Sequence, residues 1–184
     1  TPMSQRPTGL PKNVLLARKR TCRPPPAIST IGSSRPFGWF STKIVGPRDG
    51  KAGSLGSIGV RFMIDTEETE AGGFSLVEHP MPPRALAAPL HRHSREDEYS
   101  YVLEGRMGAL LGDDVVYAEA GDLVHKPRDQ WHTFWNAGDE PCRILEIISP
   151  AGFEDFFREL DALGGALQAA PEDLGALNER YGLE

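Results

Sequence analysis

The sequence contains little cysteine and no long apolar run. Two cysteines occur among 184 residues, Cys22 and Cys142, and neither belongs to a Cys-x-x-Cys pair. They make no disulfide framework, so the sequence is not that of a disulfide-stabilised secreted domain, and a cytoplasmic location is expected. No segment approaches the ~18 apolar residues that a membrane-spanning helix needs. We therefore expect no membrane partner.

Acidic residues are missing from the N-terminal quarter. Residues 1–48 carry nine basic side chains and no acidic one, whereas the rest of the chain carries 11 basic and 26 acidic side chains. An acidic body repels phosphate backbones, so nucleic acid is not an expected partner. The basic segment is interrupted by eight prolines and lacks apolar periodicity. Residues 1–48 are predicted to be a disordered leader, although an Arg-rich targeting peptide or sequence upstream of the true start fits the same composition.

Short apolar runs separated by Gly, Pro and Asp fill residues 49–150. Runs of four to seven residues at close spacing are typical of strands in an antiparallel sandwich or barrel. The expected strands are 58–64, 74–79, 98–103, 107–111, 115–118, 123–126, 131–135 and 143–148. The sequence therefore predicts an all-β barrel over residues 49–150.

The pattern changes after Pro150. Apolar residues recur at intervals of three and four from Phe153 to Leu163, and Gly164 ends the pattern. A second helix is predicted to start at Pro171. We expect residues 151–184 to form two short helices that pack on the outside of the barrel in a structural role.

Three of the five histidines combine with one glutamate in a spacing suited to metal binding. His91 and His93 are two residues apart, which puts both imidazoles on one face of an extended segment. A turn after His93 would return Glu98, at the start of a predicted strand, to the same space, and His132 lies on a separate strand. Three imidazoles and one carboxylate suit a divalent transition metal and leave open coordination positions. His79 and His125, by contrast, are interpreted as structural residues.

Strand alternation also predicts the surroundings of this cluster. Ser100 and Val102 share a face with Glu98, and Phe134 shares a face with His132. These three residues are the predicted walls of a substrate pocket. Aromatic side chains of the same strands face the opposite way and are expected to pack against flanking segments or to form a homodimer interface. They are Tyr99, Tyr101, Trp131 and Trp135.

Two spaced motifs resemble those of the cupin superfamily. The first reads Gly-x5-His-x-His-x(3–4)-Glu-x6-Gly in the family, and this chain matches it except at Ala85, the leading glycine position. The second reads Gly-x5-Pro-x-Gly-x2-His-x3-Asn, and the chain departs only at Asp129, the inner glycine position. The matched residues are His91, His93, Glu98 and Gly105 in the first motif, and Gly121, Pro127, His132 and Asn136 in the second.

The resemblance implies a double-stranded β-barrel, or jelly roll, and a metal held by His91, His93, Glu98 and His132. The details are most similar to small single-domain cupins related to quercetin dioxygenase. The expected cofactor is one divalent transition metal, with Fe, Mn, Ni, Co, Cu and Zn left open. The expected activity is that of a mononuclear dioxygenase on a small aromatic or enolisable molecule, with Glu98 as the catalytic residue that takes the substrate proton. A non-oxidative isomerase or decarboxylase and a non-catalytic binding protein stay open as alternatives.

Overall fold

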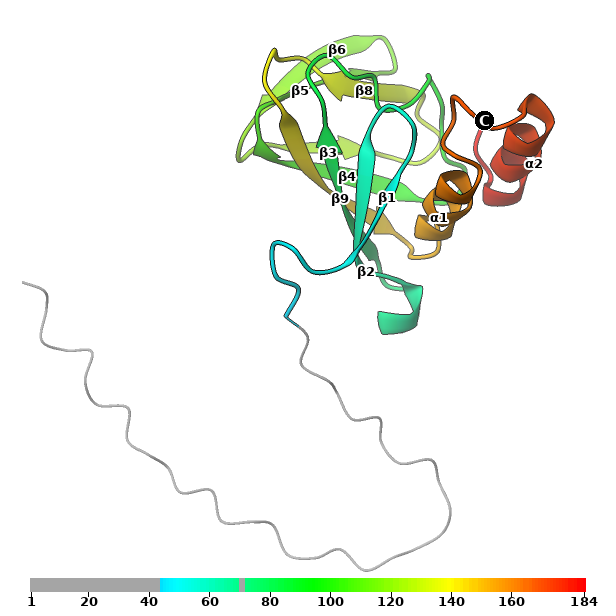
Figure 1. The fold of residues 1–184 in the computed structure, drawn as a ribbon. Helices are drawn as coiled ribbons and strands as arrows, with labels where there is room; N and C mark the ends of the chain where they lie inside the picture. The colour runs from blue at the N-terminus through cyan, green and yellow to red at the C-terminus, as the bar shows by residue number, and fades with distance from the viewer. Residues whose placement is uncertain (1–43, 70–71) are drawn as a thin grey trace, which may run out of the picture. The chain divides into compact units, whose positions relative to one another are not determined.

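The computed structural model describes residues 44–69 and 72–184 (Figure 1). Most of the predicted leader, residues 1–43 with Cys22, lies outside the described residues. Cys142 is buried and free. No helix among the described residues is long and apolar enough to cross a membrane.

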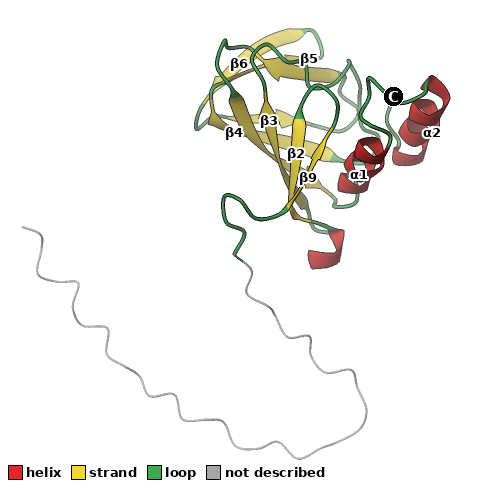
Figure 2. Ribbon diagram, viewed as in Figure 1, coloured by secondary structure: helices red, strands yellow, loops and turns green. Residues whose placement is uncertain are grey.

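The described residues form two antiparallel sheets that face each other (Figure 2). The larger sheet has the order β1-β2-β3-β9-β4-β7, and the smaller one has the order β6-β5-β8. The strands are β1 (Lys51–Ser54), β2 (Gly59–Ile64), β3 (Ser75–Met81), β4 (Asp97–Glu104), β5 (Arg106–Leu111), β6 (Asp114–Glu119), β7 (Leu123–Lys126), β8 (His132–Asn136) and β9 (Cys142–Ser149). The predicted double-stranded barrel is confirmed.

Each of the eight expected strands is present, and each end falls within two residues of its predicted position. The strand β1 was not predicted, because Lys-Ala-Gly-Ser has no alternation of apolar and polar residues. Its place in the sheet comes from antiparallel pairing with β2. Secondary structure here is decided by a partner strand and not by local sequence.

The core lies between the two sheets, as the alternating burial of β9 shows. This strand pairs with both β3 and β4, and its residues alternate strictly between buried and half-buried. Ile144 and Ile148 on β9 are fully buried, as are Val77 on β3 and Met107 on β5. Burial of such side chains is worth about 1.5–3 kcal/mol each, so the paired inner faces hold the barrel together.

Two helices follow the barrel, α1 (Glu154–Ala162) and α2 (Pro171–Tyr181), and a short 3-10 helix (Thr66–Glu68) follows β2. Both α-helices lie at the same end of the barrel (Figure 1). α1 buries Phe156, Phe157 and Leu160, the apolar face predicted from the sequence. The two predicted C-terminal helices are thus confirmed.

Candidate metal centre

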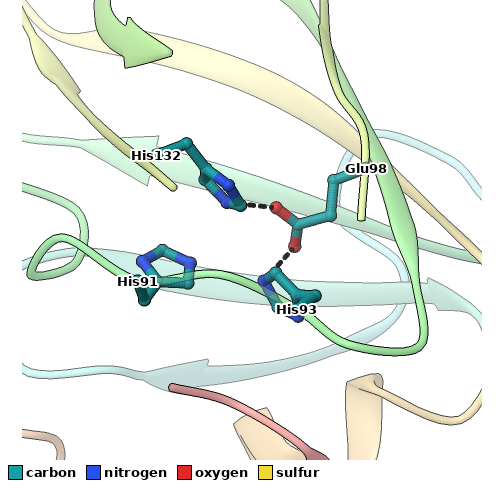
Figure 3. Close-up of side chains that lie close together, drawn as sticks. All are labelled: His91, His93, Glu98 and His132. Atoms are coloured by element: carbon teal, nitrogen blue, oxygen red, sulfur yellow. Dashed lines mark ion pairs between the residues drawn. The ribbon is translucent and has the colours of Figure 1, made fainter. Parts of the chain in front are cut away.

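The four residues of the sequence-derived cluster converge between the two sheets (Figure 3). Glu98 comes from β4 in the larger sheet and His132 from β8 in the smaller one, whereas His91 and His93 come from the segment that joins β3 to β4. One potential ligand atom from each of them lies within 4.8 Å of the others. The group could therefore hold a single metal ion.

Backbone pairing explains how this connecting segment reaches the site. His91 and His132 form an antiparallel bridge, with N–O distances of 3.0 and 2.7 Å. The backbone N–H of Asp129 donates to the His93 carbonyl at 2.7 Å, from a left-handed conformation with φ of 64°. Asp tolerates this conformation better than most residues, so the departure from glycine at position 129 preserves the turn.

Hydrogen bonds to backbone carbonyls orient two of the imidazoles. His91 Nδ1 lies 2.7 Å from the Pro89 carbonyl oxygen, and His132 Nδ1 lies 2.9 Å from that of Gln130. A carbonyl oxygen only accepts, so each Nδ1 carries the proton and each Nε2 presents a lone pair. This is the tautomer in which a histidine binds metal through Nε2.

The inner nitrogen atoms of the cluster lack hydrogen-bond partners, as expected for atoms that bind a metal ion. His93 Nε2 lies 3.5 Å from Glu98 Oε1, and His132 Nε2 lies 3.3 Å from Glu98 Oε2. All three side chains are almost fully buried, yet across the described ranges neither Nε2 atom makes a hydrogen bond. Buried polar atoms are rarely left without a partner. Three imidazoles around a carboxylate match the preferences of a divalent transition metal.

The electrostatics keep His91 and Glu98 in the protonation states that bind metal. Burial and the neighbouring His132 lower the pKa of His91 to about 3, so its imidazole is neutral at physiological pH. Burial alone would raise the pKa of Glu98, but the Lys126 ammonium and His93 hold it well below its ordinary value. Glu98 is therefore a carboxylate before any metal arrives.

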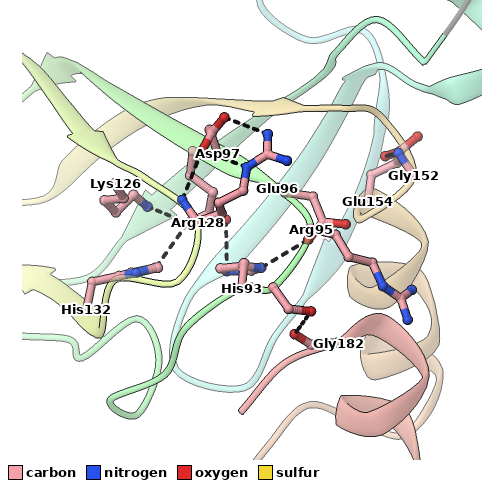
Figure 4. A network of polar contacts seen from close by, with 12 residues as sticks. His93, Arg95, Glu96, Asp97, Lys126, Arg128, His132, Gly152, Glu154 and Gly182 are labelled. Atoms are coloured by element: carbon pink, nitrogen blue, oxygen red, sulfur yellow. Dashed lines mark hydrogen bonds and ion pairs between the residues drawn. The ribbon is translucent and has the colours of Figure 1, made fainter.

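A second layer of contacts supports His93 (Figure 4). The buried carboxylate of Glu96 lies 3.7 Å from His93 Nδ1, and the Phe153 ring packs edge-on against the imidazole at 4.4 Å. On the other side, the C-terminal residues pair with the backbone of the loop. The Ser94 N–H donates to the Gly182 carbonyl at 3.0 Å. The segment after α2 thus holds the loop that carries two of the candidate ligands.

An apolar cavity of about 170 Å³ opens onto the cluster. This volume is far larger than a single water molecule needs, so it can admit a small organic ligand. Its apolar walls include Leu55, Ile58, Phe134, Phe153, Phe157 and Leu160, and the metal-cluster residues His91, His93 and Glu98 close one part of it. Aromatic and aliphatic walls around a few convergent polar groups are typical of small-molecule sites.

Comparison with known proteins decides the family. Residues 77–148 match the family described as "Cupin domain". This chain is a member of the cupin superfamily. The solved structure of KdgF from a Halomonas species aligns with a TM-score of 0.54 and 16% identity over 62% of this chain and 99% of KdgF, which shows the shared fold. The quercetin-dioxygenase-like subtype stays a prediction.

Two relatives are more similar in sequence. The structure of the polyketide cyclase RemF from Streptomyces resistomycificus aligns with a TM-score of 0.51 and 32% identity over 59% of this chain and 80% of RemF. The polyketide synthase CurC of Streptomyces cyaneus is 35% identical over 60 residues, which are 33% of this chain and 39% of CurC. The matched regions span 39 to 49% of the length of the curated relatives.

A buried lysine next to the cluster was not found by sequence reasoning. Lys126 Nζ lies 2.9 Å from Glu98 Oε2 and 3.1 Å from Glu146 Oε1, and it sits 4.4 Å from the centre of the Phe134 ring. Burial lowers the pKa of Lys126, but the two carboxylates outweigh it and raise the pKa overall. Burial also raises the pKa of Glu146 to about 7, against the opposing effect of Lys126. Lys126 is buried on the same face of β7 as Val124, but nothing in its spacing signalled a pairing with Glu98.

The cavity differs from the predicted pocket in two ways. Phe134 lines it, whereas Ser100 and Val102 are fully buried and do not. Strand alternation gives the face of a residue but not what covers it, and the Ser100 hydroxyl is taken up in a 2.7 Å hydrogen bond to Glu146. The C-terminal helices were expected to be purely structural, yet they contribute cavity walls from both α1 and α2.

Two further histidines behave largely as interpreted from the sequence. His79 donates from Nδ1 to the Gly59 carbonyl at 3.0 Å, and burial lowers its pKa to about 4. His125 stacks on Tyr99 with 4.7 Å between ring centres. His79 nevertheless also lines the cavity, so its neutral ring contributes to the surface that faces a ligand.

Proposed function

We propose that this cupin is a metal-dependent enzyme that acts on a small aromatic or enolisable molecule of the polyketide or polyphenol kind. The observation that supports this most directly is the apolar cavity that ends on the His91, His93, Glu98 and His132 cluster. The similarity to the polyketide cyclase RemF and to the polyketide synthase CurC supports the substrate class.

The proposed metal ligands are His91 and His132 through Nε2, together with His93 and Glu98. A divalent transition metal bound there, whether Fe, Mn, Ni, Co, Cu or Zn, would act as a Lewis acid for negative charge on an enolate or phenolate oxygen. The apolar walls would exclude water from the substrate, which strengthens electrostatic interactions in the cavity. The Glu98 carboxylate, already ionised, is the group that would accept a proton from the substrate.

Two reaction types use this arrangement. Non-oxidative chemistry on an enolate, as in a cyclase, isomerase or decarboxylase, is supported by the similarity to RemF. The mononuclear dioxygenase predicted from the sequence is the second candidate, because four protein ligands leave coordination positions for both a substrate anion and dioxygen. A cupin that binds its ligand without turnover would leave that ligand unchanged after long incubation.

Elemental analysis of purified variants tests the metal assignment. We expect His93→Ala and His132→Ala to lose most of the bound metal while keeping the β-sheet circular dichroism of the wild type. His125→Ala is the matched control, because its ring lies outside the cluster against Tyr99, and it should retain full metal content. Full occupancy in both cluster variants would refute the assignment.

Substrate depletion then separates the reaction types. Metal-loaded protein is incubated with phenolic and diketone compounds in air and in anaerobic buffer, with an oxygen electrode as readout. Product formed at equal rates in both conditions supports the non-oxidative reaction, and oxygen uptake coupled to product supports the dioxygenase. The homodimer and the cytoplasmic location stay predictions. Exposed Tyr101 and Trp131 fit a dimer interface, which light scattering would detect.

A further inference from the structure

Glu146 is a polar group in the cavity wall outside the proposed metal ligands. It projects inward from β9, which pairs with β3 on one side and β4 on the other. The side chain is 1% exposed and forms part of the cavity wall. A carboxylate in a largely apolar wall is costly to bury, which makes its position informative.

Contacts on both carboxylate oxygens hold Glu146 in place. The Ser100 hydroxyl donates to Oε2 at 2.7 Å, and Lys126 Nζ lies 3.1 Å from Oε1. Both partners are fully buried, and Ser100 lies on the adjacent strand β4. Each carboxylate oxygen has two lone pairs, so one partner on each leaves capacity to accept a further hydrogen bond. Rigid support of this kind is what a binding group needs for selectivity.

Lys126 also sets the distance between Glu146 and the metal cluster. Its ammonium contacts Glu98 Oε2 at 2.9 Å and Glu146 Oε1 at 3.1 Å, so these two oxygens lie within about 6 Å of each other. Glu146 therefore lies within the span of one or two aromatic rings of the cluster. Both existing partners of Glu146 are donors, the Ser100 hydroxyl and the Lys126 ammonium, so a ligand group that meets these oxygens is expected to donate a hydrogen bond as well.

We propose that Glu146 is a substrate-binding residue that accepts a hydrogen bond from a hydroxyl group of the ligand. The ligand class is an aromatic or enolisable molecule with a metal-binding oxygen and a second hydroxyl on the same or the adjacent ring. This inference rests on the proposed function and narrows it from aromatic molecules in general to hydroxylated ones.

Other polar cavity groups are less suited to this role. His79 uses Nδ1 for the Gly59 carbonyl. Asn178 on α2 has a buried Oδ1 without a partner in the described part of the chain, but its side chain is only partly buried and no contact fixes its orientation. Glu146 alone among these three combines full burial with contacts on both of its oxygens.

A matched series of ligands tests the proposal. Zinc-loaded protein with all 184 residues is titrated in a calorimeter with 2-hydroxyacetophenone and with its 2,4-, 2,5- and 2,6-dihydroxy relatives. All four probes share one metal-binding group, and three of them add a hydroxyl at different ring positions. We expect at least one dihydroxy probe to bind about tenfold more tightly than 2-hydroxyacetophenone, the effect of one hydrogen bond to a charged acceptor.

Two variants assign that preference to Glu146. In Glu146→Leu, the affinities for the dihydroxy probe and for 2-hydroxyacetophenone should differ by no more than about twofold. The affinity for 2-hydroxyacetophenone and the zinc content should stay at wild-type values. Glu146→Gln keeps the size of the side chain and should lower the preference several-fold, so it serves if the leucine variant does not fold. Glu119→Gln makes the same chemical change on β6 at a side chain that is 66% exposed and outside the cavity lining, and it should leave the preference intact.

The possible results distinguish a failure of the Glu146 assignment from a failure of the proposed metal-dependent function. Zinc-dependent binding of all four probes with equal affinity overturns the hydroxyl preference and leaves the proposed function standing. A preference that persists in the Glu146 variants overturns the assignment to this residue. Binding that is absent, or that is the same with and without zinc, overturns both the metal-dependent function and the ligand class.

Discussion

Replacing Lys126 with methionine removes the cation that lies between two buried carboxylates. At an effective dielectric constant of about 20, each of the contacts at 2.9 and 3.1 Å corresponds to roughly 5 kcal/mol of Coulomb attraction. Much of this is offset by the cost of burying the charges, so the net value of the pair is far smaller. The variant, however, leaves Glu98 and Glu146 without their shared partner. We expect Lys126→Met to lower the free energy of unfolding by about 3–5 kcal/mol.

A double variant tests the reason for that loss. In Lys126→Met combined with Glu146→Gln, one of the two uncompensated charges is absent, so the combined loss should be smaller than the sum of the single losses. We expect a coupling energy of about 1–3 kcal/mol. Guanidinium unfolding followed by the fluorescence of Trp131 and Trp135 measures these values.

An exposed cation is the control for this series. Arg84 forms an ion pair with Asp139 in which both side chains are more than half exposed. Arg84→Met should change the free energy of unfolding by no more than about 1 kcal/mol. A loss below about 1 kcal/mol for Lys126→Met, or strict additivity with Glu146→Gln, would show that Lys126 does not balance these carboxylates.

Three further predictions concern the C-terminal segment. Phe153→Ala removes the ring that packs on His93, and it should lower the free energy of unfolding by about 3–5 kcal/mol. It should also weaken zinc binding, which calorimetry measures. Unchanged zinc affinity would show that the ring does not orient His93. Glu154→Gln weakens the bonds that the buried carboxylate accepts from Thr66 N at 2.6 Å and Gly152 N at 2.7 Å. Burial would raise the pKa of Glu154, but the bonds from Thr66 hold this pKa below 4.5. The carboxylate therefore contributes about 1–3 kcal/mol of stability above pH ~4.5, and this contribution is lost as the pH falls through the folded-state pKa. A difference in unfolding free energy between wild type and variant that stays constant down to acid pH would contradict this. Gly182→Ala places a side chain on a residue with a φ of 68° and against the Ser94 hydroxyl, so it should lower stability by about 1–2 kcal/mol. Gly175→Ala, on a part of α2 with no neighbouring atoms, should raise stability slightly. Equal shifts in the melting temperature for the two variants would refute this reasoning.

Much of the fold was predictable because local alternation and burial agree. In β4, Glu98, Ser100 and Val102 are buried and their neighbours are not, as the alternation of the sequence required. The same agreement allowed the strands to be located to within two residues. The strand β1 is the exception, since its four residues carry no pattern and only pairing with β2 makes them a strand.

The sequence by itself indicated the cluster: short-range spacing groups His91, His93 and Glu98, and the resemblance to the second cupin motif adds His132. His91 and His93 share a face whenever the segment is extended, and Glu98 begins the next strand. Only the tertiary structure decided that Lys126 lies between Glu98 and Glu146 and that the Ser100 hydroxyl donates to Glu146. It also decided that Phe153 and α2 form part of the cavity wall. These contacts join residues far apart in the chain, and the packing of sheets and helices that creates them leaves no trace in local periodicity.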